Sequence, residues 1–433
     1  MEQTDRTGEE TGAAKGTGSR EDSGTDEPIT SVDDAAAATS AADGAQKTTV
    51  EEPPTTTHTP AAADGENPPQ GPRALDDGSS TGGAGGNEKA DGEAEATKQP
   101  PRRRWRRLIL ALVLALLVPL LAAESALRLN YTGDPKKGTY TRNRDAIWLG
   151  HAWVDGRKTE ADVNALAHRL EGAGIRDLYV HAGPLEHNGT LPKSAYAKAD
   201  WLTKTLHGRA PRLRVQAWLG DVLATEGPTG MRLERPATRA AVVASTREIL
   251  AAGFDGVHFD LEPLHSGDRD YLTLLDSLRS VTRAHHALLS VAAHQIDPLP
   301  GFHAFWGTVA GHPKWWSQRF FGQVARRVDQ IAVMSYDTMQ PLQSLYGGYV
   351  AQQTSLALEV TPPSTDLLMG LPFYHENRFG HWNHAETVPA AVRGVRLGLS
   401  RTDADRSRFG VALYVDFAAT EADWRAYRDG WVR

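Results

Sequence analysis

Three side chains able to gain or lose a proton occur two residues apart in one short apolar segment. The segment reads Phe254-Asp255-Gly256-Val257-His258-Phe259-Asp260-Leu261-Glu262. Because alternate side chains of a β-strand share a face, His258, Asp260 and Glu262 are expected to lie close together. Two carboxylates that are near each other and partly shielded from water raise the pKa of at least one of them. The spacing therefore predicts a carboxylic acid that keeps its proton near neutral pH and can protonate a leaving group.

A second apolar segment ends in a phenol and a carboxylate, Tyr336 and Asp337. Polar and aromatic residues also stand at the ends of most other apolar runs: His151 and Trp153, His181, Trp218 and Asp221, His294 and Gln295, Tyr374, His375 and Glu376, and Asp416. Aromatic rings can stack on the apolar faces of sugars, and carboxylates and imidazoles can bind sugar hydroxyls. The set as a whole indicates a carbohydrate-binding cleft, although any single Trp could equally fill a protein core.

Together the two segments resemble the family 18 glycoside hydrolases, the chitinase-like barrels. Their fourth strand carries Asp-Gly-x-Asp-x-Asp-x-Glu and their sixth Met-x-Tyr-Asp, which correspond here to residues 255–262 and 334–337. The resemblance implies that Glu262 is the general acid/base, that Asp260 orients a 2-acetamido group and that Tyr336 binds its carbonyl oxygen. The amide of the sugar is then the nucleophile. Asp337 would help to hold the same sugar.

The chain departs from the family pattern at three strands. His258 stands where the family has an Asp, the third strand ends Trp218-Leu219-Gly220-Asp221, and the eighth, Tyr414-Val415-Asp416-Phe417, lacks a Trp. A protonated His258 would favour the ionised form of Asp260. The predicted substrate-binding residues are Asp337, His258, Asp255, Trp218, Trp153, Met334, Tyr374, Glu376 and Asp416. No cofactor is expected, and no metal either, because the chain has no Cys and no His-Glu-x-x-His motif.

The elements that must position these residues alternate regularly from about residue 145 to the end. The expected strands are Ala146–Trp153, Asp177–Ala182, Leu213–Gly220, Gly256–Leu261, Leu288–Ala293, Gln330–Ser335, Leu367–Phe373 and Val411–Phe417. An amphipathic segment follows each strand, which is typical of parallel βαβ units. Eight units over about 290 residues predict a closed (β/α)8 TIM barrel, residues 145–433, with catalytic groups at the carboxyl ends of its strands. An open doubly wound sheet is disfavoured because no Gly-rich phosphate loop follows the first strand.

The segment before the barrel has a different composition. Residues 1–100 contain no aromatic residue and 21 Asp or Glu against 7 Lys or Arg, so residues 1–101 are predicted to be a disordered acidic tail. Residues 102–127 combine five arginines with an apolar run, and 108–127 are long enough for a transmembrane helix. The arginines place the tail in the cytoplasm and the barrel outside. Residues 128–144 would be a linker. Whether the helix is cleaved after Ala123 is open, although a retained anchor is favoured.

These features predict a single-pass membrane protein whose extracytoplasmic barrel hydrolyses a polysaccharide, one containing N-acetylated amino sugars. Two alternatives stay open: a carbohydrate-binding barrel without turnover, and a retaining glycosidase that uses Glu262 and Glu376. The expected partners are a glycan and, through residues 108–127, the lipid bilayer. Residues 108–433 carry a net charge of only +2, which disfavours a nucleic-acid binder. The sugar, the linkage and the oligomeric state cannot be predicted.

Overall fold

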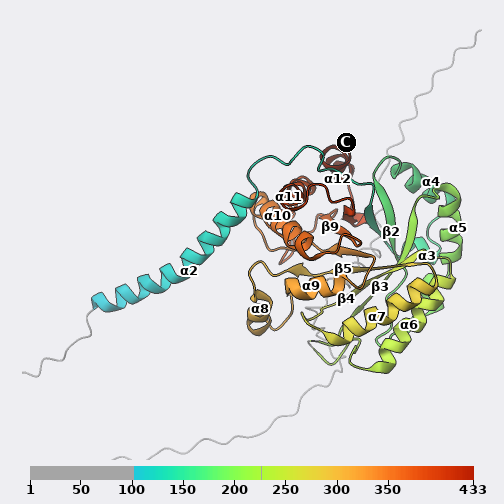
Figure 1. The fold of residues 1–433 in the computed structure, drawn as a ribbon, viewed down its shortest axis with the longest axis horizontal. Coiled ribbons are helices and arrows are strands. Elements are labelled where there is room, and N and C mark those ends of the chain that lie inside the picture. The colour runs from blue at the N-terminus through green and yellow to red at the C-terminus, as the bar shows by residue number, and fades with distance from the viewer. Residues whose placement is uncertain (1–101, 226) are drawn as a thin grey trace, which may run out of the picture.

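The computed structural model describes residues 102–433 except residue 226. At its centre lies a closed barrel of eight parallel strands in the order β1-β10-β9-β8-β5-β4-β3-β2 (Figure 1). The strands are β1 (Asp145–Leu149), β2 (Ile175–His181), β3 (Arg214–Val222), β4 (Gly256–Glu262), β5 (Leu288–Ala293), β8 (Gln330–Val333), β9 (Asp366–Pro372) and β10 (Phe409–Tyr414). The predicted (β/α)8 fold is therefore confirmed.

Helices that follow the strands in the sequence cover the outside of the barrel (Figure 1). They are α4 (Glu160–Arg169), α5 (Ala199–Arg209), α6 (Pro236–Ala251), α7 (Arg269–Ala284), α9 (Gln318–Ala325), α10 (Gln343–Val360), α11 (Val388–Thr402) and α12 (Glu421–Tyr427). Shorter turns are α3 (Ala152–Asp155), η1 (Lys193–Tyr196), η2 (Asp416–Ala418) and η3 (Arg428–Val432). The predicted first strand extends too far, because residues 152 and 153 already belong to α3.

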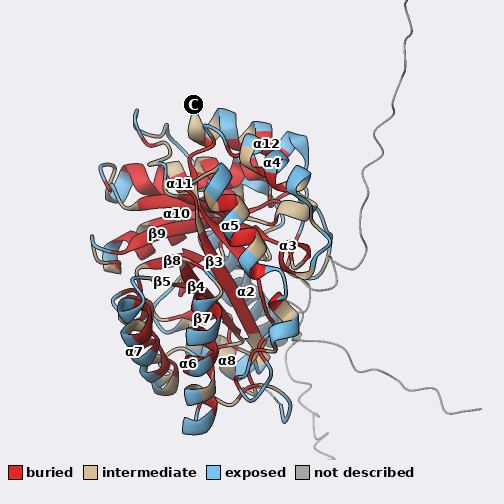
Figure 2. Ribbon diagram, turned by 90° about the vertical axis from the view of Figure 1, so that its right-hand side faces the viewer, coloured by how far each residue is buried: buried red, intermediate tan, exposed pale blue. Residues whose placement is uncertain are grey.

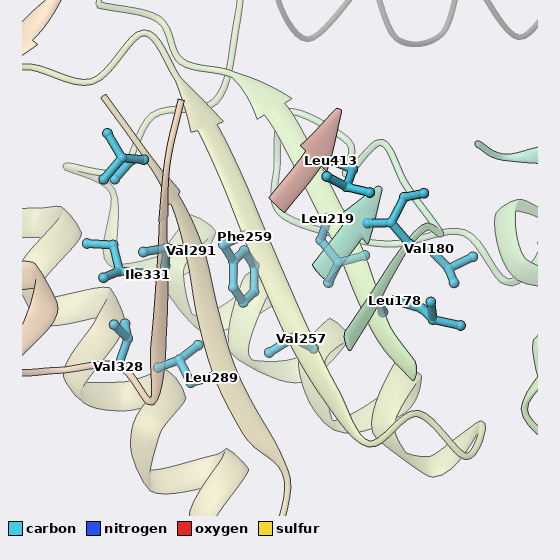
Figure 3. Packing of buried hydrophobic residues seen from close by; sticks show 14 of the residues in the cluster. Leu178, Val180, Leu219, Val257, Phe259, Leu289, Val291, Val328, Ile331 and Leu413 are labelled. Atoms are coloured by element: carbon cyan, nitrogen blue, oxygen red, sulfur yellow. The ribbon is translucent and has the colours of Figure 1, made fainter. Parts of the chain in front are cut away.

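Alternate side chains of each strand point in opposite directions, either outward into the layer between the barrel and the helices or inward into the barrel. Val257 and Phe259 of β4 point outward and pack with Leu219, Leu289 and their neighbours in the large apolar layer between barrel and helices (Figure 3). Figure 2 shows that the strands and the inner faces of the helices are buried. The alternate residues of β4 are thereby left inside the barrel, which positions the candidate site.

An insertion that the sequence did not predict lies between β5 and α9. It contains β6 (Gln295–Ile296), α8 (Phe302–Ala310) and β7 (Trp315–Trp316), and β6 pairs with β7 in parallel. The Asp297 carboxylate accepts the backbone N–H of His303 at 2.5 Å and of Gly301 at 3.2 Å, which fixes the start of α8. On α10, Gln353 accepts the N–H of Ile296 at 2.6 Å and donates to its carbonyl at 2.8 Å.

In the described part of the chain, the helix α2 (Arg102–Asn130) precedes the barrel. Its stretch Trp105–Asn130 is long and apolar enough to cross a membrane, by length and composition alone. The large apolar side chains of this stretch that the structure describes from Leu108 to Leu121 are exposed, whereas its last turn contacts the barrel. The predicted acidic tail, residues 1–101, lies outside the described residues.

The end of α2 is docked firmly on the barrel. The ring of Tyr131 and the backbone of Leu127 occupy the space that a Cβ atom would need at Gly347 and Gly348 of α10. Arg401 of α11 donates to the carbonyls of residues 130 and 132 at 2.6 and 2.8 Å. Such cationic groups are favourable at the carboxyl end of a helix.

The segment after α2 also contacts α11. The N–H of residue 136 donates to the Ser400 hydroxyl at 2.8 Å, and Arg396 donates to the carbonyl of Thr139 at 3.0 Å. The stretch predicted as a linker, residues 128–144, thus begins within α2 and then packs along the barrel.

Candidate active site

The interior face of β4 carries three titratable side chains, each one closer than the last to the carboxyl end of the strand. His258 is fully buried, Asp260 is almost fully buried, and the Glu262 side chain at the strand end is 22% exposed. The indole N–H of Trp218 on β3 donates to Asp260 Oδ2 at 3.1 Å. The other oxygen, Oδ1, is buried and has no hydrogen-bond partner within the described part of the chain. Such an acceptor is costly to leave unpaired, which makes it a place for a ligand N–H or O–H.

Burial and neighbouring charges raise the pKa values of the Asp260 and Glu262 carboxyls to different extents. Burial raises the pKa of Asp260 to about 6, against the opposing effect of the Trp218 hydrogen bond. Burial, followed by the negative charges of Asp260 and Asp337, raises the pKa of Glu262 well above its usual range, and the Lys314 ammonium opposes this. Of the two carboxyls, Glu262 is therefore the one whose protonated form these surroundings favour more strongly. Its Oε1 lies 3.4 Å from Nε2 of His294.

Tyr336 reaches this site from the segment after β8. Its ring stacks on Tyr414 of β10 with centroids 5.0 Å apart and meets Tyr374 edge-on at 5.9 Å. Burial, with the neighbouring Tyr414, Asp260, Asp337 and Glu262, raises the pKa of Tyr336 well above 10, so its hydroxyl keeps its proton. A protonated phenol beside two carboxyls can donate a hydrogen bond to a substrate oxygen.

Asp337 is the most strongly hydrogen-bonded of the predicted residues. The Tyr374 hydroxyl donates to Oδ1 at 2.6 Å, and Arg378 donates to Oδ2 at 2.8 Å. Burial alone would raise the pKa of Asp337, but His381, Arg378 and Tyr374 together lower it. Asp337 thus stays ionised, and its charge helps Glu262 to remain protonated.

A buried histidine bridges two carboxylates in the same region. His381 Nδ1 lies 3.1 Å from Asp337 Oδ1 and 3.2 Å from Glu386 Oε2. Burial opposes charge on His381, yet its interactions with the Asp337 and Glu386 carboxylates raise its pKa to about 9. The three groups have the spacing of a metal site, with ligand atoms within 4.8 Å of one another. With a protonated His381, the three groups form an ion-paired network.

The expectation of a protonated His258 is wrong. Trp148 Nε1, which can only donate, lies 3.2 Å from His258 Nε2, so Nε2 accepts and Nδ1 carries the proton. Nδ1 then donates to the Ser290 hydroxyl at 2.6 Å. The ring stacks on Tyr179 at 3.7 Å, and burial lowers its pKa well below 6.5. His258 is a neutral packing residue beneath the site and does not reach a substrate.

Asp255 also fails to join the site. It precedes β4 and lies at the opposite, amino end of the barrel, where it accepts the N–H of Val215 at 2.7 Å and lies 2.8 Å from His207 Nε2. Trp153 and Asp416 contact each other instead of forming an open sugar platform, since the indole N–H donates to Asp416 Oδ2 at 3.0 Å. Burial raises the pKa of Asp416 to about 6.

The remaining predicted residues take different positions. Trp218 is only 1% exposed, so it holds Asp260 rather than offering a stacking surface. Tyr374 is buried over Asp337, and Met334 is half-buried. Glu376 is exposed in the segment after β9 and is not among the charges that shift the pKa of Glu262.

Sequence reasoning missed four contributors, namely Lys314, Arg378, His381 and Glu386. Lys314 comes from the unpredicted insertion and donates to the carbonyl of residue 337 at 2.7 Å. Burial lowers its pKa, and the charges of Asp337, Glu386 and Glu262 counteract this. The other three lie on the long segment after β9, where no spacing in the sequence indicates them.

No protein-family model matches the chain, and no curated protein sequence matches it. Solved structures similar to it include the spore cortex-lytic enzyme SleL of Bacillus megaterium QM B1551, at 13% identity and TM-score 0.46, covering 66% of this chain and 74% of that one. A class V chitinase from Pseudomonas fluorescens Pf-5 is 14% identical with TM-score 0.44, and the match covers 66% of this chain and 98% of that one. A chitinase from Chromobacterium violaceum ATCC 12472 is 14% identical with TM-score 0.46, and the match covers 66% of this chain and 98% of that one. The likeness to these structures concerns the fold alone.

Proposed function

We propose that the barrel is a glycoside hydrolase that cleaves an oligosaccharide or polysaccharide containing N-acetylated amino sugars. One observation carries the proposal: Asp260 Oδ1, a buried carboxylate oxygen with no hydrogen-bond partner among the residues that the structure describes, lies on the same strand face as Glu262, whose pKa is raised well above its usual range. A 2-acetamido group has one N–H to give to Asp260 and one carbonyl oxygen to accept from Tyr336.

The proposed reaction begins when Glu262 donates its proton to the glycosidic oxygen. The bond between that oxygen and the anomeric carbon breaks while the acetamido oxygen attacks the same carbon. Asp260 holds the amide N–H, so the positive charge that develops on the amide lies beside a carboxylate. Glu262, now ionised, takes a proton from water as the hydroxide opens the cyclic intermediate and yields the free sugar. The Lys314 ammonium stabilises the ionised form of Glu262 between these steps.

We further propose that α2 anchors this enzyme in the cell membrane with the barrel outside. The exposed apolar helix Trp105–Asn130 supports a single span, and the arginines at its start favour a cytoplasmic amino terminus. Residues 1–101 would then form a cytoplasmic acidic tail.

Matched chromogenic substrates test the proposed chemistry. The enzyme should cleave aryl N-acetylglucosaminide oligomers and leave the corresponding glucosides intact, and Asp260→Asn should remove most of the turnover. Efficient cleavage of glucosides together with a nearly inactive Glu376→Gln variant would indicate the two-glutamate mechanism instead. Glycan binding without hydrolysis of any substrate would identify a binding barrel.

A further inference from the structure

We propose that an apolar surface on the rim of the barrel rests on the lipid bilayer that α2 crosses. This bilayer-facing patch consists of Leu299, Phe305 and Val309 of the insertion together with Leu342, which precedes α10. The proposal extends beyond the reaction and depends on the proposed anchorage, not on which sugar is cleaved.

Exposed apolar side chains are concentrated on one sector of the rim. Outside α2, the large apolar side chains that are exposed in the described chain are Leu299, Phe305, Val309, Leu342, Phe379 and Trp382, with exposures of 64, 59, 67, 43, 89 and 37%. All six lie in segments that follow the carboxyl ends of β5, β8 and β9. These three strands are neighbours in the barrel, so the six side chains share a sector of the catalytic face.

Helix α8 is held so that one side faces the protein and the other faces away. The rings of Phe302 and Trp306 pack against Trp315, with centroids 5.0 and 5.4 Å apart. Phe305 and Val309 lie on the other side and are exposed. No Asp, Glu, Lys or Arg occurs from residue 298 to residue 313. A firmly mounted helix with an uncharged apolar outer face is unusual where only water surrounds it.

The insertion and α2 are mounted on the same helix. Gln352 of α10 donates to the carbonyl of Pro298 at 3.0 Å, in addition to the Gln353 bonds described above. Leu127 and Tyr131 pack on Gly347 and Gly348, in the first turns of α10. That end of α10 lies at the carboxyl ends of the strands, because each helix runs antiparallel to its strand. In Figure 1, α2 projects from the side of the barrel on which α8 lies.

A bilayer surface fits this patch better than a glycan or a second copy of the chain. Leu299, Val309 and Leu342 cannot hydrogen-bond to sugar hydroxyls, and the exposed helix lacks charged residues that would specify a protein partner. Interfacial helices typically place Phe, Trp and Leu side chains about 5–10 Å into the boundary between headgroups and acyl chains. Because α2 and the patch share one support, insertion of α2 brings the patch to the membrane surface.

Site-directed spin labelling tests the proposal, since the chain has no Cys and each introduced cysteine is unique. The full chain is placed in bilayers of phosphatidylethanolamine and phosphatidylglycerol with a nitroxide at Val309→Cys. The control is Lys204→Cys, on α5 at the opposite side of the barrel (Figure 1), where the side chain is 74% exposed. Leu114→Cys within α2 reports the anchorage separately.

We expect oxygen to relax the label at residue 309 more than a soluble nickel chelate does, with a depth of about 5–10 Å below the phosphates. The label at residue 204 should show the reverse preference. If residue 114 lies in lipid while residue 309 resembles residue 204, the patch proposal is wrong and the anchor stands. If residue 114 is also accessible to the chelate, the anchorage itself fails. Spin–spin broadening at residue 309 would reveal a second copy, and protection by chitin oligosaccharides in detergent would reveal a glycan surface; either result overturns the proposal.

Discussion

Replacing Trp218 with Phe should move the acidic limb of the pH–activity profile to higher pH. The Trp218 indole donates the hydrogen bond at 3.1 Å that opposes the effect of burial on Asp260. Phe keeps an aromatic ring in the same place but cannot donate. The ionised form of Asp260 therefore loses stabilisation, while the protonated form loses little.

The size of the shift follows from the energy of one charge-assisted hydrogen bond. Such a bond to an ionised group contributes about 1.5–3 kcal/mol, and about 1.4 kcal/mol corresponds to one pKa unit. The pKa of Asp260, about 6 in the native protein, should thus rise to about 7–8 in the variant. Since the proposed reaction requires an ionised Asp260, activity at pH 6.5 should fall by about 3- to 25-fold, whereas activity above pH 8.5 should change far less.

The assay is kcat against pH on an aryl chitooligosaccharide, accompanied by thermal unfolding over the same pH range. The pKa of Asp260 is raised from 3.8 to about 6 on folding, so the native state binds the proton more tightly than the unfolded state. Stability is then greatest below about pH 4 and falls as the pH rises to about 6, by about 3 kcal/mol for this group. In Trp218→Phe the decline should continue to about pH 7–8.

Trp148→Phe is the matched control, because its indole N–H donates one layer deeper, to His258 at 3.2 Å. This variant should lose stability without moving the acidic limb. An unmoved limb in Trp218→Phe, or an equal movement in both variants, would refute the assignment of Asp260 as the group whose ionisation controls turnover.

Four further outcomes are expected. Glu262→Gln should lower kcat by about 10²–10⁴-fold on substrates with poor leaving groups, while Glu376→Gln keeps most of the activity; comparable losses would count against the acid assignment. Lys314→Gln should shift the basic limb to higher pH, because the ammonium opposes the raised pKa of Glu262, and a downward shift would contradict this. His381→Gln should lower the free energy of unfolding by about 3–5 kcal/mol at pH 7, since it removes the cation beside the buried Glu386 carboxylate; chemical denaturation measures it, and an unchanged midpoint would show that the network does not depend on that charge. Protease added to intact cells should digest the barrel and spare residues 1–101, and protection of the barrel would reverse the proposed topology.

The barrel and the central strand of the site were predictable because they follow a strict period. In β4 the alternation of Val257 and Phe259 with His258 and Asp260 is enough to assign the two faces of the strand. The predicted strand, Gly256–Leu261, already left Asp255 before its first residue, yet the motif placed Asp255 among the substrate-binding residues, although it lies at the other end of the barrel. A pattern of residue types shows which side chains share a face, but not how far along the barrel axis each one reaches.

The charges that surround the acid were not predictable for a different reason. Lys314 lies next to a two-residue strand, Trp315–Trp316, which is too short to produce a periodic pattern. His381 and Glu386 come from an irregular segment, where contacts depend on tertiary folding. The charge state of His258 required knowledge of its burial and of its donor, Trp148, which is 110 positions away in the sequence.

At Gly347 and Gly348, where α2 meets α10, the helix packs directly on the barrel with no flexible segment between them. A flexible tether would let an enzyme search a volume whose radius grows with tether length, whereas in the proposed topology this joint would fix both the height and the tilt of the barrel above the membrane. In the proposed topology the enzyme would diffuse within the plane of the membrane and reach only glycan segments passing at one distance from it. Location would then act as a second form of substrate selection: chemically identical linkages farther out in a cell wall would not be cut. Inserting Gly-Ser repeats after residue 131 would relax that selection without altering a single residue of the catalytic site.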